Sequence, residues 1–166
     1  MSKSLFFDYI QMVLTILYIY YLLTHFDINY YAVLITVIIG LLDWYYNYNK
    51  LKSKYKSINI ECIVFSIMHH LFMSALFTGV FWFKTCPYIH VFTIIFFTLG
   101  YMLRFGYNEN CYMTRLTDHY CQTNTNISSD SLFWNDEIPF IPIDIRNRLM
   151  LVVLFDLIYI KLFYKK

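Results

Sequence analysis

Residues 62–83 read CIVFSIMHHLFMSALFTGVFWF, a run of apolar and aromatic side chains with two adjacent histidines and no other ionisable group except its first cysteine. A helix rises about 1.5 Å per residue, so a run of this length can cross a hydrocarbon core of roughly 30 Å. Four further apolar runs, some of them shorter, occupy residues 5–26, 30–48, 87–103 and 149–163. The pattern predicts an all-α fold, an integral membrane helical bundle of four to five transmembrane helices that forms one membrane domain over residues 1–166.

The composition of the chain agrees with a membrane environment. Of its 166 residues, 59% are hydrophobic and 14% are charged, whereas a soluble domain has about 25% charged residues. No alternating strand pattern is present, so helices are the expected way to satisfy the backbone in lipid. The net charge of +2 comes without a cluster of basic and aromatic residues, so nucleic acid is not a predicted partner. The predicted partners are the lipid bilayer and further copies of the chain or other membrane proteins, and no cofactor or metal is predicted.

The lysines and arginines between the runs predict an orientation in the membrane. Nine of the 13 fall in segments on the side of the N-terminus, and four fall on the other side. Because cytoplasmic segments are rich in these residues, the count predicts a cytoplasmic N-terminus. The sequon Asn126-Ile127-Ser128, inside a polar loop predicted over residues 107–148, indicates the opposite orientation. If residues 149–163 lie on the membrane instead of crossing it, the bundle has four spans and the last lysines join the cytoplasmic side.

A few ionisable residues lie inside the apolar runs. Such a residue costs on the order of 2.5–3.5 kcal/mol to insert, so it usually has a partner. Asp43, His69 and Asp156 each lie about 10 Å from one end of a predicted span, given the rise per residue, and His70 follows His69. This shared depth predicts a cluster that relays protons, binds a metal or holds the bundle together by packing. His90 is predicted near the other face, which excludes a haem held by His70 and His90.

The segment after the fourth run is rich in potential ligands. Residues 104–121 read RFGYNENCYMTRLTDHYC, in which Glu109, Cys111, His119 and Cys121 are candidate zinc ligands. Their C-x7-H-x-C spacing matches no common zinc module. A Cys111–Cys121 disulfide in a luminal loop, or two free thiols in a cytosolic loop, are the competing interpretations.

A set of short motifs resembles a known family. The motifs are His69-His70, Gly79-Val80-Phe81-Trp82, His90, and Asn108 followed by Cys111-Tyr112-Met113-Thr114. Together they are similar to small uncharacterised multi-pass membrane proteins of large nucleocytoplasmic DNA viruses. They are more distantly similar to a bacterial membrane family of unknown function with a C-x-L-T motif.

This resemblance covers about residues 66–121 and departs from the pattern at two positions. Met113 replaces the Leu of C-x-L-T, and Arg104 stands where a His-Trp pair is expected. The resemblance implies a viral-type membrane protein and no mechanism. It directs attention to one candidate loop motif, which consists of Asn108, Cys111, Thr114, His119 and Cys121.

Three functions are compatible with these residues. The first is a membrane protein without enzymatic activity, with a structural or interaction role in a virion or host membrane. The second is a small proton-coupled channel or transporter that uses Asp43, His69, His70 and Asp156. The third is a membrane enzyme with a site built from the two histidines and the cysteine-containing loop. The chain lacks G-x-S-x-G, H-E-x-x-H and P-loop motifs, so none of these catalytic motifs supports the enzyme hypothesis.

Overall fold

The computed structural model describes residues 3–51, 59–105, 112–121 and 145–164, and these residues are helical with short connections. The prediction of an all-α fold is therefore confirmed. The elements are α1 (Lys3–His25), α2 (Tyr30–Leu51), α3 (Ile60–Thr78), the 3-10 helix η1 (Gly79–Trp82), α4 (Tyr88–Phe105), α5 (Tyr112–Cys121) and α6 (Ile145–Phe163). Two segments, Leu5–His25 and Ile60–Trp82, are long and apolar enough to cross a membrane, by length and composition.

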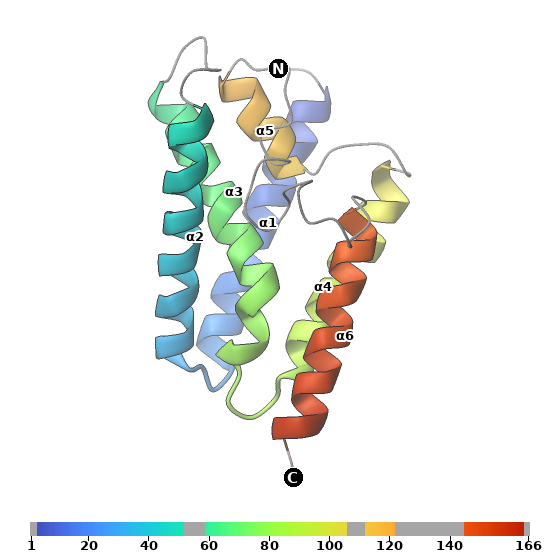
Figure 1. The fold of residues 1–166 in the computed structure, drawn as a ribbon. Coiled ribbons are helices and arrows are strands. Elements are labelled where there is room, and N and C mark those ends of the chain that lie inside the picture. Colours follow the sequence, from blue (N-terminus) through green and yellow to red (C-terminus); the bar gives the residue numbers. More distant parts are fainter. Residues whose placement is uncertain (1–2, 52–58, 106–111, 122–144, 165–166) are drawn as a thin grey trace.

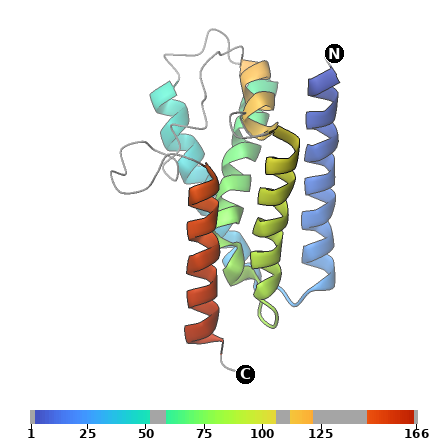
Figure 2. The ribbon, with the colours of Figure 1, turned by 90° about the vertical axis from the view of Figure 1, so that its right-hand side faces the viewer.

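The long helices lie side by side along one axis of the molecule (Figure 1). The start of α1, the end of α2, the start of α3 and α5 share one end of the bundle, called here the N-terminal end. The connection at residues 26–29, η1 and the end of α6 share the opposite end, called here the C-terminal end. Figure 2 shows α4 between α6 and α1 in the turned view.

Helices α2 and α3 approach each other closely at a glycine. A Cβ atom on Gly40 would lie 2.7 Å from Ser74 Oγ and 3.1 Å from Leu71 Cα. Both distances are shorter than ordinary contacts, so a side chain at this position would have to displace Ser74 and the α3 backbone. An apolar core, with Val80, Ile94 and other residues, joins α3 and η1 to α4 and α6.

The two connections at the C-terminal end are bonded to each other. Ile28 and Phe83 form an isolated antiparallel bridge, and the Asn29 amide donates to the Trp82 carbonyl at 2.7 Å. The Trp82 indole in turn donates from Nε1 to Thr36 Oγ1 at 2.8 Å. These bonds hold the start of α2 against the end of α3, and the turn before Pro87 then reverses the chain into α4.

Helix α5 corrects the prediction of a polar loop over residues 107–148. Its side chains Tyr112, Met113, Leu116 and Cys121 are buried, and it packs on α1 and α3. The reason is its amphipathic pattern, because apolar residues three to four positions apart line one face of a helix. The N-terminal part of α6 also lies within the predicted loop, and residues 122–144 lie outside the described residues.

Candidate functional site

Three buried aspartates carry the most informative geometry of the bundle. They are Asp8 on α1, Asp43 on α2 and Asp156 on α6. Each carboxylate contacts a basic side chain on a different helix: Arg115, His70 and His90, respectively. Every one of these pairs therefore joins two helices, as polar side chains do inside membrane bundles.

The structure brings Asp43 together with His70. The Nδ1 atom of His70 lies 2.6 Å from Asp43 Oδ2. One turn further along α2, Asn47 donates from Nδ2 to Asp43 Oδ1 at 3.0 Å and to the Asp43 carbonyl at 2.9 Å. The carboxylate thus accepts from two side chains, which fixes its orientation close to the narrow α2–α3 contact at Gly40.

His69 does not join this pair. Its ring is buried, its centroid lies 6.0 Å from that of His70, and none of the hydrogen bonds within the described residues involves it. Adjacent residues point about 100° apart on a helix, so only one of the two histidines can face Asp43. Within the part of the chain that the structure describes, no group of three or more His, Cys, Asp or Glu side chains is placed to hold a metal ion.

Asp156 corrects the predicted cluster of four residues. It pairs with His90, whose Nδ1 atom lies 2.7 Å from Asp156 Oδ2, and not with Asp43 and His70. The cause is the position of α6, which begins at Ile145 and runs beside α4. Asp156 therefore lies about 17 Å from the start of α6, level with the first turn of α4 near the C-terminal end.

The pair of His90 and Asp156 is tightly enclosed. A Cβ atom on Gly79 would lie 2.5 Å from both Cδ2 and Nε2 of His90, so the imidazole rests directly on the backbone of η1. The second carboxylate oxygen, Asp156 Oδ1, is buried without a hydrogen-bond partner among the described residues. A cavity of about 40 Å³ borders His90 on the side of Tyr18 and Thr93.

Arg115 attaches α5 to α1. Its Nε atom donates to Asp8 Oδ2 at 3.0 Å and its Nη2 atom donates to Asp8 Oδ1 at 2.5 Å. The hydroxyls of Thr15 and Tyr112 add a second link at 2.9 Å. Asp8 lies inside the apolar run of residues 5–26, but the sequence alone does not identify its partner. The signal that was available is the spacing of Tyr112 and Arg115, which places them on one face of α5.

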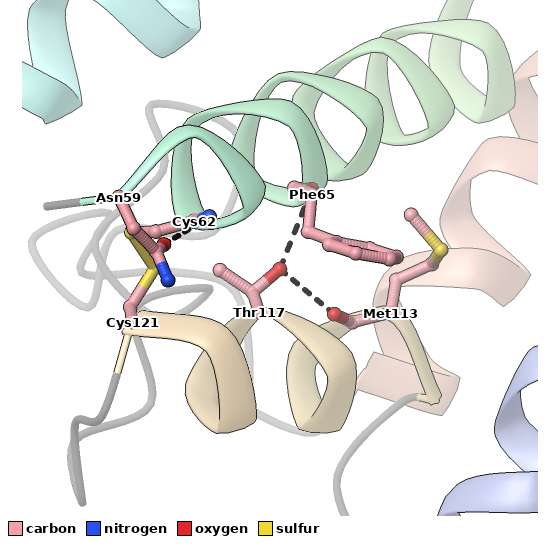
Figure 3. The surroundings of a disulfide bond; sticks show 6 residues. All are labelled: Asn59, Cys62, Phe65, Met113, Thr117 and Cys121. Atoms are coloured by element: carbon pink, nitrogen blue, oxygen red, sulfur yellow. Dashed lines mark hydrogen bonds between the residues drawn. A yellow bond between two sulfur atoms is a disulfide. The ribbon is translucent and has the colours of Figure 1, made fainter.

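A disulfide joins Cys62 on α3 to Cys121 on α5, with 4.7 Å between the Cα atoms (Figure 3). It lies beside the N-cap of α3, where Asn59 Oδ1 accepts from the Cys62 amide at 2.8 Å. The Thr117 hydroxyl, one turn before Cys121, donates to the Met113 carbonyl at 2.9 Å and lies 3.4 Å from the Phe65 carbonyl.

This bond corrects two sequence-based hypotheses. Cys121 is bonded to Cys62 and not to Cys111, and a sulfur in a disulfide is not a thiolate ligand for zinc. His119 is exposed, and its ring makes an edge-to-face contact with that of Tyr120. Asn108, Glu109 and Cys111 lie outside the described residues, and Thr114 is described only as part of the α5 backbone.

A larger apolar cavity of about 280 Å³ lies among α1, α2, α3 and α5. Residues such as Ile19, Val33 and Met68 line it, and its polar groups bond to one another, as in the Trp82 and Thr36 pair. Neither this cavity nor the one beside His90 is lined by Asp43, His69 or His70. The Asp43–His70 pair therefore does not lie on the wall of either of these two cavities.

The fold and its buried pairs define a class, a helical bundle with hydrogen-bonded polar pairs between its helices and a disulfide at one end. No family model matches the chain, and no curated protein or solved structure matches it either. The resemblance to viral and bacterial membrane families stays a prediction, and function is argued from the geometry.

Proposed function

We propose that the chain is a multi-pass integral membrane protein without enzymatic activity, which acts by packing against partner proteins in a virion or host membrane. The observation that carries the proposal is an inverted pattern of burial. On α2, Leu34, Ile38 and Leu42 are 56%, 48% and 63% exposed, whereas Asp43 and Asn47 are 2% and 0% exposed. A helix in water shows the reverse, because apolar side chains are buried and charged ones are solvated.

Helix α6 repeats the pattern. Leu154, Phe155 and Ile158 are exposed, and Asp156 between them is fully buried. In a hydrocarbon solvent the outward side chains are in their preferred environment, and the inward polar groups bond to each other. The same inversion on two helices that lie on opposite sides of the bundle in Figure 1 supports a lipid environment for both.

The paired aspartates favour a packing role over chemistry at Asp43. The Asp43 carboxylate is hydrogen-bonded to His70 and Asn47 and lines neither the 280 Å³ cavity nor the 40 Å³ cavity described above. A general base or proton carrier needs access to its substrate or to water. A polar pair that only holds two helices together needs no such access. The outward apolar faces of α2 and α6 are then available to lipid, further copies of the chain or other membrane proteins.

Membrane integration and partner contact can be tested on the full chain in eukaryotic cells. We expect the protein to stay in the membrane pellet after alkaline carbonate extraction and to be released by detergent. A photocrosslinking amino acid at the exposed Leu34 should give protein adducts, whereas the same group at the buried Met73 should give none. Release by carbonate would contradict membrane integration, and adducts with lipid alone at Leu34 would contradict the interaction role on that face.

The pair of His90 and Asp156 favours a second candidate, a small proton-conducting protein. His90 borders a 40 Å³ cavity, which is large enough for water by volume, since about 10–15 Å³ holds one molecule. Asp156 Oδ1 offers an acceptor without a partner in the described residues. Proteoliposomes with a pH-sensitive dye test this candidate, because it predicts proton flux that His90→Gln abolishes and Asp43→Asn leaves unchanged. Flux equal to that of empty liposomes would exclude it.

A further inference from the structure

The two ends of the bundle differ in the state of their cysteines. At the N-terminal end, Cys62 and Cys121 are joined in a disulfide between α3 and α5. At the C-terminal end, Cys86 follows the bridge between the two connections and is a free, exposed cysteine. An exposed thiol and a disulfide on opposite ends of one molecule are expected when the two ends face compartments of different redox state.

Disulfides persist in oxidising compartments and are rare where glutathione and thioredoxin keep thiols reduced. We infer that the N-terminal end of the bundle faces an oxidising, extracytoplasmic compartment and that the end with Cys86 faces the cytosol. The inference rests on the proposed membrane function, because only a membrane separates the two ends. It assigns the orientation opposite to that predicted from the lysines and arginines.

A sequence feature points in the same direction. The sequon at Asn126 follows Cys121 by five residues, and Cys121 ends α5 at the N-terminal end. N-glycosylation acts on the luminal side, as disulfide formation does. The two features are chemically independent, and they require the same side of the membrane.

The charge count is the evidence against this orientation, and the structure weakens it. Arg115 was counted as a loop charge, but it lies in α5 and is paired with the buried carboxylate of Asp8. A paired charge inside the fold does not act as a free topological signal. The bias of lysine and arginine in loops is also a tendency with exceptions, whereas a disulfide is a covalent bond that cytosolic reductants remove.

Cysteine accessibility in cells tests the orientation. The full chain with Cys111→Ser is expressed in eukaryotic cells, so that Cys86 is the one cysteine outside the disulfide. Digitonin opens the plasma membrane and leaves internal membranes sealed, and a membrane-impermeant maleimide is then added. We expect full labelling of Cys86 and no labelling of Cys62 or Cys121 until a reductant and a detergent are added. The matched control, Cys111→Ser with Cys86→Ser, should lose the label.

Two results would overturn the inference. One is a Cys86 that is labelled only after detergent opens the internal membranes, and the other is labelling of Cys62 and Cys121 before any reductant is added. A glycan at Asn126, removed by endoglycosidase and lost in Asn126→Gln, would support it. Alkaline carbonate extraction of the same cells distinguishes the two failures. Release of the chain contradicts membrane integration and the orientation with it, whereas a chain that stays in the pellet and is labelled at Cys86 only after detergent contradicts the orientation alone.

Discussion

Substituting Gly79 by alanine tests the geometry of the His90–Asp156 pair. Gly79 has φ of −63° and ψ of −21°, a helical conformation that alanine adopts without strain. The added Cβ would lie 2.5 Å from Nε2 and Cδ2 of His90, whereas ordinary contacts begin near 3.4 Å. The imidazole must therefore move by about 0.9 Å, the difference between these two distances.

A movement of this size along the hydrogen bond breaks the pair. The Nδ1 atom of His90 lies 2.7 Å from Asp156 Oδ2, and N–H···O hydrogen bonds occupy only about 2.7–3.2 Å. A shift of 0.9 Å along the line between the atoms leaves that range in either direction. The loss of a hydrogen bond to a charged group costs about 1.5–3 kcal/mol in water-soluble proteins, whereas hydrogen bonds between membrane helices contribute about 0.6 kcal/mol on average. Overpacking adds about 1–3 kcal/mol. We therefore expect Gly79→Ala to lower the free energy of unfolding by about 2–4 kcal/mol.

The same substitution should change sign when the ring is removed. In a His90→Ala background the added methyl group meets no imidazole, and alanine in a helical conformation is favoured over glycine by about 0.5–1 kcal/mol. The loss of the pair is then common to both proteins and cancels in the difference. Gly79→Ala is therefore expected to be neutral or stabilising there.

Reversible unfolding provides the measurement. The four proteins of this double-mutant cycle are purified in a mild detergent and titrated with SDS, and helix content is followed by far-UV circular dichroism. A coupling free energy of about 2–4 kcal/mol between Gly79 and His90 is the expected result. An equal cost of Gly79→Ala in both backgrounds would refute the reasoning, because the ring would then not be what limits the space.

Three further substitutions, one of them with a matched control, probe the other contacts. Cys62→Ser should destabilise the bundle by at most about 4 kcal/mol, from loop closure over a sequence separation of 59 residues, and reductant should shift the unfolding of the wild type but not of the variant. Asp43→Asn should lower the free energy of unfolding by about 1 kcal/mol, as for other hydrogen bonds between membrane helices. Asp27→Asn is the matched control, because Asp27 pairs with Lys84 on the surface and both side chains are half-exposed. It should change the free energy of unfolding by less than about 0.5 kcal/mol. Gly40→Ala should lower the free energy of unfolding by about 1–3 kcal/mol, because the added Cβ would meet the backbone of Leu71 as well as the Ser74 side chain. An unchanged unfolding curve would contradict this, since it would show that α2 and α3 can move apart at no cost in stability.

The approach of Asp43 to a histidine of α3 was predictable, and the reason is geometric. Helices α2 and α3 are joined at the N-terminal end, so the depths of Asp43 and His70 are both counted from the same end. Counting residues from a shared connection gives the relative level of two side chains directly. The choice of His70 over His69 was not predictable, because it depends on the rotation of α3 about its own axis.

The partner of Asp156 was not predictable in this way. Asp156 lies at the centre of the predicted span 149–163, seven residues from either end, so its depth does not say which end it is nearer. Helix α6 begins four residues earlier, at Ile145, which moves Asp156 toward the C-terminal end of the bundle. There it meets His90, the histidine that the sequence had placed at that end.

The disulfide and the ion pair of Arg115 depend on the docking of one short helix. Four cysteines allow three complete pairings, and spacing does not choose among them. Counting Arg115 as a topological charge presumes that its segment is a loop. Once α5 packs between α1 and α3, the same contact pairs Arg115 with Asp8 and brings Cys121 to Cys62. Docking of α5 thus removes one charge from the count that predicts a cytoplasmic N-terminus and creates the bond from which we infer the opposite orientation.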